Sequence, residues 1–150
     1  MTRLTPDSRE DYVWFLPIQT RWTDNDVYGH INNAVYYFYF DAAVNAYLIQ
    51  EGALVINGPG EIGLVVDTGC SYFAPAAFPD TIHAGLRVTK IGTSSVRFEI
   101  GIFKNDDPLA VAQGHFVHVY VDEQSRKPAA LSDNLKAALR KIEKTAPNER

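Results

Sequence analysis

The feature that most constrains this chain is a long apolar segment, residues 34–49. Every residue in it is apolar or aromatic except Asp41 and Asn45, which lie four positions apart and so form one narrow stripe on a helix. The segment is too short for a membrane span, which needs about 20 predominantly apolar residues. A helix that is apolar nearly all round must be covered nearly all round, by a curved sheet wrapped on it or by such a sheet together with a partner subunit. The segment therefore predicts a buried core helix that ends at Gly52.

Strands that can cover this helix follow it without an intervening helix. Apolar and polar side chains alternate in each of them, which is the period of a strand with one covered face. We expect strands over residues 12–23, before the helix, and over residues 62–74, 81–91, 96–102 and 109–121 after it. In the first strand after the helix, Leu64, Val66, Cys70 and Tyr72 occupy alternate positions and are expected to share one face. The short connections favour an antiparallel meander.

The two ends of the chain are polar. Residues 1–11 are expected to fray. Residues 132–145 predict an amphipathic surface helix with Ser132 as its N-cap. The fold class is therefore α+β: one curved antiparallel sheet of about five strands wrapped around a long central helix, plus a C-terminal helix, in a single domain of residues 1–150. An open sheet leaves edge strands unpaired, and pairing two edges across a two-fold axis would satisfy them, so we expect at least a dimer.

Composition excludes several classes of protein. With 46% hydrophobic and 21% charged residues the chain is an ordinary globular protein. A net charge of −4 argues against non-specific binding of nucleic acid. Cys70 is the single cysteine, so an internal disulfide is impossible. The first residues hold no apolar stretch of the kind found in signal peptides. We expect a cytoplasmic protein without nucleic-acid or membrane partners.

A polar turn, residues 24–33, stands directly before the predicted helix. Asn32 or Asn33 can cap the helix, and the aspartates can lie near its positive end. Such a turn needs no catalytic role, because acidic residues commonly precede helices. From the residues alone, a structural role and a chemical role are about equally supported.

The run R-x-T-D-x-D-x-x-G-H-x-N-N-x-x-Y, from Arg21 to Tyr36, resembles the signature of the hotdog-fold acyl-CoA thioesterases of the 4-hydroxybenzoyl-CoA thioesterase-like superfamily. The similarity covers most of the chain, including the order of elements and the Lys127-Pro128 pair after the last strand. The resemblance implies a hotdog fold, hydrolysis of an acyl-CoA substrate, and a homodimer or homotetramer.

The resemblance also implies which side chains act. By position, Asp26 matches the acidic residue that the family uses as a base or nucleophile, and His30 and Asn33 match the polar positions after it. Asp24 is expected to pair with Arg21 or to cap the turn. His30 either orients water or substrate or is a structural hydrogen-bond donor. Asn33 either contacts the substrate carbonyl or caps the helix, and the cap is favoured.

Thioester hydrolysis needs no cofactor, because the carbonyl is already electrophilic and a thiolate is a good leaving group. It needs a positioned water or nucleophile and hydrogen-bond donors for the oxyanion. Backbone N–H groups at the start of the helix, residues 32–34, can supply these donors.

The phosphates of coenzyme A require a local basic site on this acidic chain. Candidates are the basic and hydroxyl side chains Arg87, Lys90, Ser94, Ser95, Arg97, Arg126 and Lys127. For any one of them the role of an ordinary solvated residue is favoured, and only the cluster indicates a binding site. Asp41 either lines the acyl pocket or faces a subunit seam.

Other functions remain as alternatives. A hotdog domain can bind acyl-CoA or an acyl carrier without cleaving it, and a related hotdog enzyme is a dehydratase. The sequence lacks the motifs of serine hydrolases, zinc proteases and phosphate-binding loops. His115 and His118 are three apart in a predicted strand and so point to opposite faces, which makes them a poor metal pair. No metal site is predicted.

Overall fold

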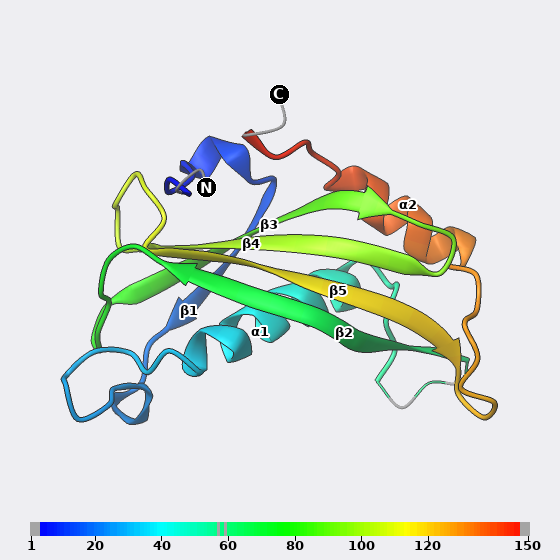
Figure 1. The fold of residues 1–150 in the computed structure, drawn as a ribbon, viewed down its shortest axis with the longest axis horizontal. Coiled ribbons are helices and arrows are strands. Elements are labelled where there is room, and N and C mark those ends of the chain that lie inside the picture. The colour runs from blue at the N-terminus through cyan, green and yellow to red at the C-terminus, as the bar shows by residue number, and fades with distance from the viewer. Residues whose placement is uncertain (1–3, 57, 59, 148–150) are drawn as a thin grey trace.

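The computed structural model describes residues 4–56, 58 and 60–147. Five strands form one antiparallel sheet in the order β1-β3-β4-β5-β2. Their bounds are β1 Trp14–Gln19, β2 Glu61–Tyr72, β3 Thr81–Ile91, β4 Ser95–Lys104 and β5 Ala112–Asp122. The sheet curls around α1 (Val35–Gln50), and α2 (Asp133–Lys141) packs against β3 (Figure 1). The expected arrangement of sheet, central helix and C-terminal helix is confirmed.

The strand order differs from a simple meander. β3, β4 and β5 follow one another, but β2 pairs with β5 at one edge and β1 pairs with β3 at the other. The reason is the path of α1, which carries the chain beneath the sheet from the β1 edge to the β2 edge (Figure 1). β2 therefore begins beside β5. The backbone N–H and C=O groups at the outer edge of β5 are free to pair, whereas β3 already pairs with β1 and β4.

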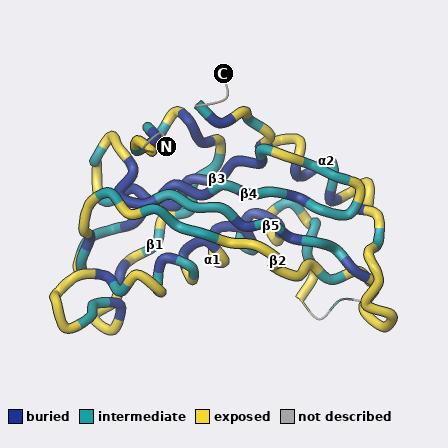
Figure 2. The backbone as a smooth tube through the Cα atoms, in the orientation of Figure 1, coloured by how far each residue is buried: buried dark blue, intermediate teal, exposed yellow. Residues whose placement is uncertain are grey.

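The core lies between α1 and the concave face of the sheet. Phe40 of α1 and Phe98 and Ile100 of β4 are fully buried there. Figure 2 shows buried stretches along α1, β3 and β4. Phe40 lies directly on Gly114 of β5, where an added Cβ would overlap its ring. Gly52 has a φ of +70° after the last turn of α1, which confirms the predicted helix end.

One stripe of α1 is left open by the sheet. Phe38 is 69% exposed and Ile49 is 46% exposed, and Asp41 lies between them on the same stripe. The sheet of one chain therefore covers α1 only in part, although the sequence predicted cover nearly all round.

β2 is a long edge strand with an irregularity. The pairing with β5 shifts register between Val65 and Asp67, which leaves Val66 as an extra residue in the strand. An extra residue reverses the alternation of side chains. The prediction that Leu64, Cys70 and Tyr72 share one face of the strand is therefore wrong. Cys70 and Tyr72 lie on the concave face together with Gly63 and Val65, and Leu64 lies on the convex face.

The N-terminal segment was expected to fray over residues 1–11. Residues 1–3 lie outside the described residues, but the segment after them packs on the convex face and includes a 3-10 turn, η1 (Arg9–Asp11). The Asp7 carboxylate lies 3.0 Å from the Arg87 guanidinium and accepts a hydrogen bond from the Tyr12 hydroxyl at 2.8 Å.

Candidate active site

The polar turn between the 3-10 helix η2 (Trp22–Asp24) and α1 is tightly closed. The N–H of Asp26 donates to the carbonyl oxygen of His30 at 2.8 Å, and Gly29, with a φ of +79°, turns the chain between them. The N–H of Ile31 donates to Ala76 at 2.8 Å and anchors the turn on the connection between β2 and β3. The sequence thus holds Asp26 and His30 together through the backbone.

Asp24 is buried and structural. Its carboxylate accepts hydrogen bonds from the Arg21 N–H at 2.9 Å, from the Arg21 guanidinium at 2.9 and 3.1 Å, and from the Tyr39 hydroxyl at 2.8 Å. Burial raises the pKa of Asp24, but these hydrogen bonds outweigh burial and hold the pKa below its usual range. The expected pairing with Arg21 is confirmed.

Asp26 is the less engaged carboxylate of the turn. It is half-buried, and its Oδ1 accepts a hydrogen bond from the N–H of Tyr28 at 2.9 Å. Its Oδ2 has no hydrogen-bond partner among the described residues. One carboxylate oxygen of Asp26 is therefore available to a water molecule or a substrate.

The start of α1 differs from the prediction in one respect. The side-chain oxygen of Asn32 accepts a hydrogen bond from the N–H of Ala34 at 2.9 Å and forms an Asx turn before the helix. The N-cap residue is Ala34 and no side chain caps the helix, so the favoured capping role for Asn33 is wrong. An Asx turn needs the side chain two residues before the N–H that it holds, and Asn32 has that spacing.

Asn33 is exposed and contributes its backbone. Its carbonyl oxygen accepts a hydrogen bond from the Tyr72 hydroxyl at 2.7 Å, which ties the turn to the end of β2. Its N–H has no acceptor among the described residues. A free donor therefore stands at the positive end of α1, in the turn that holds Asp26. His30 is exposed in the same turn.

The residues predicted to bind coenzyme A do not lie near Asp26 within one chain. Lys90, Ser94 and Ser95 lie at the turn between β3 and β4, which contacts the segment after β5 through the Leu131 N–H and the Thr93 carbonyl oxygen at 2.9 Å. That segment also carries Arg126 and Lys127. This end of the sheet is opposite the polar turn (Figure 1).

Two further predicted basic residues lie on the convex face. Arg97 binds Glu99 at 2.9 Å, and Arg87 is buried between Glu99 at 2.7 Å and Asp7. Both arginines are therefore already neutralised by carboxylates.

Two cavities among the described residues have volumes in the usual range for ligand sites. The first, of about 770 Å³, lies between the C-terminal half of α1, the start of β2, the end of β5 and the segment before α2. The second, of about 840 Å³, lies on the convex face among the ion pairs of Arg87 and Glu99. Asp26, His30 and Asn33 line neither cavity, whereas Asp41 lines the first.

His118 is a polar residue to which the sequence assigned no function. It lies on the concave face in the first cavity, while His115 packs over Gly69 on the convex face. The prediction that the two histidines point to opposite faces is confirmed. A signal for His118 was present, because it shares the parity of the buried Phe116. The described residues contain no cluster of three or more potential metal ligands and no helix long and apolar enough to cross a membrane.

Comparison with known proteins identifies the relatives of this chain. The model of the thioesterase-like superfamily matches residues 20–139. The crystal structure of the PA5185 protein from Pseudomonas aeruginosa strain PAO1 is 49% identical, with a TM-score of 0.92 over 95% of this chain and 99% of that one. A search of proteins with curated functions gave no match.

Two more distant structures share the fold. A 1,4-dihydroxy-2-naphthoyl-CoA thioesterase from Synechocystis is 20% identical, with a TM-score of 0.77 over 83% of this chain and 93% of that one. The DHNA-CoA thioesterase from Staphylococcus aureus is 22% identical, with a TM-score of 0.76 over 85% and 89%. With its curved sheet around a central helix and a family match over most of its length, the chain belongs to the thioesterase-like superfamily and has the hotdog fold.

Proposed function

We propose that the protein hydrolyses an acyl-CoA thioester to a free acid and coenzyme A, with Asp26 as general base or nucleophile. One observation carries this proposal beyond the family. Of the two carboxylates in the turn, Asp24 is fully engaged by Arg21 and Tyr39. Asp26 keeps a carboxylate oxygen without a partner among the described residues, and the same turn contains the unpartnered N–H of Asn33.

The chemistry follows from these two groups. Asp26 takes a proton from a water molecule as the water oxygen bonds to the thioester carbonyl carbon. The developing oxyanion accepts a hydrogen bond from the Asn33 N–H and is further stabilised by the positive end of α1. Collapse of the intermediate breaks the C–S bond and releases the thiolate of coenzyme A. In the alternative route Asp26 attacks directly, and water then hydrolyses the mixed anhydride. In this proposal His30, which is exposed in the same turn, orients the water.

A second copy of the chain completes this site. β1 is a poor edge for pairing, because it is short and contains Pro17, which lacks an N–H. β2 is twelve residues long, contains no proline, and exposes Leu64, Val65 and Val66. We infer that two β2 strands pair antiparallel across a two-fold axis and that each covers the open stripe of the other's α1.

Antiparallel pairing also explains the distant coenzyme A candidates. It sets the Glu61 end of one β2 beside the Tyr72 end of the other. The Tyr72 end is tied to the Asp26 turn, and the Glu61 end pairs with the end of β5. Each Asp26 is thereby brought toward the partner's Arg126 and the partner's Lys127, which can bind the phosphates of coenzyme A.

The proposal is tested by release of free thiol from a panel of acyl-CoA thioesters. Asp26→Asn should lower kcat about 10²–10⁴-fold, the usual contribution of a general base, with an unchanged circular dichroism spectrum. Asp106→Asn, an exposed aspartate in the turn after β4, is the matched control and should keep full activity.

Full turnover by Asp26→Asn would refute the assignment. Tight binding of acyl-CoA without thiol release by the wild type would instead make the protein an acyl-CoA binder. Loss of water from a 3-hydroxyacyl thioester would make it a dehydratase.

A further inference from the structure

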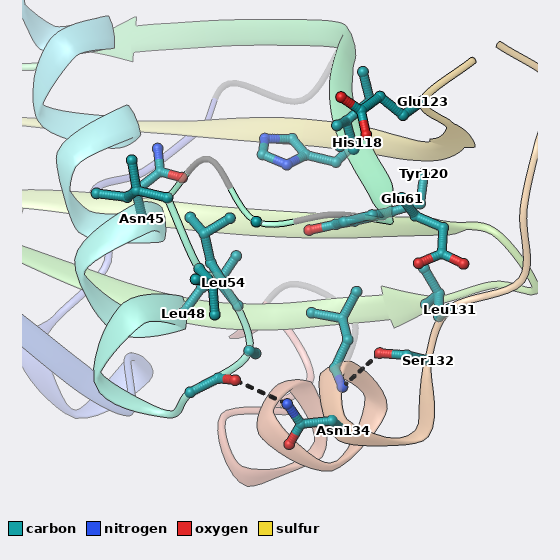
Figure 3. Close-up of a pocket in the computed structure, with 18 of the residues that line it drawn as sticks. Asn45, Leu48, Leu54, Glu61, His118, Tyr120, Glu123, Leu131, Ser132 and Asn134 are labelled. Atoms are coloured by element: carbon teal, nitrogen blue, oxygen red, sulfur yellow. Dashed lines mark hydrogen bonds between the residues drawn. The ribbon is translucent and has the colours of Figure 1, made fainter. Parts of the chain in front are cut away.

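The first cavity has the build of a small-molecule pocket. Leu48 of α1, Leu54 after it, and Leu131 before α2 give it apolar walls, and its volume of about 770 Å³ lies within the usual range for ligand sites. Polar side chains reach it from α1, from β2, from the start of α2 and from the end of β5, which contributes His118 and Tyr120 (Figure 3). No residue of the Asp26 turn lines it.

His118 is the first of these polar side chains. It is 6% exposed, and its Nε2 is buried with no hydrogen-bond partner among the described residues. The rings of Phe98 and Phe116, at centroid distances of 5.2 and 5.7 Å, hold the imidazole in place. Burial lowers the pKa of His118, so the ring is neutral near pH 7 and offers one donor and one acceptor.

Tyr120 is the second polar side chain that β5 contributes to the cavity. It follows His118 by two residues in β5 and so shares its face. Its ring lies over Gly63 of β2, and its hydroxyl makes no hydrogen bond to any described residue. Burial raises the pKa of Tyr120 to about 12, so the hydroxyl stays protonated. Figure 3 shows both rings extending from β5 toward α1.

The charges around the cavity limit what can enter it. Asp41, Glu61 and Glu123 line it, and its described lining contains no lysine or arginine. A ligand that ends in a carboxylate would meet like charges without a counter-ion. A neutral hydroxyl or carbonyl group could bond to both His118 and Tyr120.

The position of the cavity assigns it to the partner's active site. Asn45, which lines it, lies ten residues beyond the start of α1, roughly 15 Å along the helix at 1.5 Å per residue, whereas Asp26 precedes that start. The cavity is also lined by Gly63 and Val65, near the Glu61 end of β2. In the proposed antiparallel pairing, this end lies beside Tyr72 of the other chain.

We propose that this cavity receives the acyl group of a thioester held at the partner's Asp26, and that His118 and Tyr120 select a neutral acyl group with a hydroxyl or carbonyl oxygen remote from the thioester. The inference rests on the proposed thioesterase function. The leucines hold the apolar body of the acyl group, and the two β5 side chains satisfy its distal oxygen.

Matched substrate pairs test the selection. The wild type should show at least a tenfold higher kcat/KM for 4-hydroxyphenylacetyl-CoA over phenylacetyl-CoA, or for 10-hydroxydecanoyl-CoA over decanoyl-CoA, because one satisfied buried hydrogen bond changes an equilibrium by about that factor. His118→Phe should bring the ratio close to one. His115→Phe, on the opposite face of the same strand, should leave it unchanged.

Two further variants keep the test decisive. His118→Gln retains a donor and an acceptor and should preserve part of the preference. Tyr120→Phe removes a single oxygen without changing the ring, so it should fold normally and reduce the preference even where His118→Phe proves unstable in thermal unfolding. An unchanged ratio in Tyr120→Phe and His118→Phe, or no preference in the wild type for either pair, would overturn the inference and leave the thioesterase assignment intact.

A mixed dimer tests the exchange between subunits. Chains carrying Asp26→Asn and chains carrying His118→Phe, purified together through different tags, contain one intact Asp26, which works with the intact His118 of the other chain. The mixed dimer should therefore keep the wild-type preference at about half the wild-type rate. A ratio near one would show that each cavity serves its own Asp26 and would overturn the exchange.

Failure of the proposed function has a separate signature. In that case the wild type releases thiol from no acyl-CoA. Calorimetry with the neutral amides 4-hydroxyphenylacetamide and phenylacetamide then still tests the cavity, because the hydroxyl-dependent part of the affinity should be lost in His118→Phe and kept in His115→Phe. Equal binding of both amides, or none, would overturn the selection as well.

Discussion

Asp24 and Asp26 carry the same side chain two positions apart, and their surroundings give them different roles. Both stand near the start of α1, so their spacing alone left the choice open. The family motif and the position of Asp26 nearer the helix favoured Asp26. The deciding contacts come from Arg21, next to the turn, and from Tyr39, more than one turn into the helix. A contact between a loop and a helix depends on how the helix docks, which a linear sequence does not display.

The buried Asp24 leads to a prediction about acid stability. Its folded pKa lies below the ordinary value of about 3.9. The stabilisation is therefore fully present above that pH and is lost as the pH falls through the folded pKa. Asp24→Asn should lower the free energy of unfolding by about 1–3 kcal/mol at pH 7, with a smaller difference from wild type near pH 3. Urea unfolding at both pH values measures this, and an equal loss at both would contradict it.

Arg87 leads to a second prediction at this scale. It is buried between two carboxylates and lies over the Tyr12 ring at 4.4 Å. Arg87→Met would leave Asp7 and Glu99 without their common partner, and breaking a buried pair in this way costs about 3–5 kcal/mol. Arg97→Met, at a more exposed arginine on the same Glu99, should cost under about 1 kcal/mol. Chemical unfolding compares the two, and similar losses would argue against a special role for Arg87.

At the scale of elements, the local signals in the sequence located α1 and most strands well. The apolar run, the polar turn and Gly52 mark α1, and the alternation in β3 gives its bounds of 81–91. The bulge at Val66 was not predictable, because an inserted residue leaves no mark in an exposed strand of mixed apolar residues. The wrong role for Asn33 has a similar origin, because Asn32 and Asn33 are chemically identical and the backbone path decides that Asn32 forms the Asx turn.

The contact of α1 with β5 gives a prediction about packing. A Cβ at position 114 would overlap both the Gly69 carbonyl oxygen and the Phe40 ring, and neither can move without shifting backbone or core. Gly114→Ala should lower the free energy of unfolding by about 1–3 kcal/mol. Gly63→Ala meets only the Tyr120 side chain, which can rotate, and should cost less. Guanidinium unfolding ranks the two variants, and the reverse order would show that α1 does not rest on Gly114.

At the scale of the whole molecule, the strand order and the site both depend on contacts between distant segments. β2 pairs with β5 over nearly its full length, a pairing that local periodicity could not distinguish from one with β3. The polar turn and the coenzyme A candidates were predicted as one site, yet a single chain places them at opposite ends of the sheet. In the proposed dimer, antiparallel pairing of two β2 strands brings them together.

The exposed edge of β2 gives the last prediction. Val66→Lys puts a charge on this edge at a side chain that is 59% exposed in the single chain, so the fold should persist while pairing is lost. Analytical ultracentrifugation should show a monomer, and thiol release should fall to background although Asp26 is intact. Leu109→Lys, at a similarly exposed apolar residue outside β2, is the control. A fully active monomer would refute the shared site.

The order of elements along the chain has a consequence for biosynthesis. A ribosome finishes α1 about 70 residues before it finishes β5, the strand on which Phe40 rests. At a synthesis rate of roughly 5–20 residues per second, the apolar α1 segment of the nascent chain stays exposed for several seconds before β5 is complete. Chaperones that bind emerging polypeptides should therefore find their main target in this protein at α1.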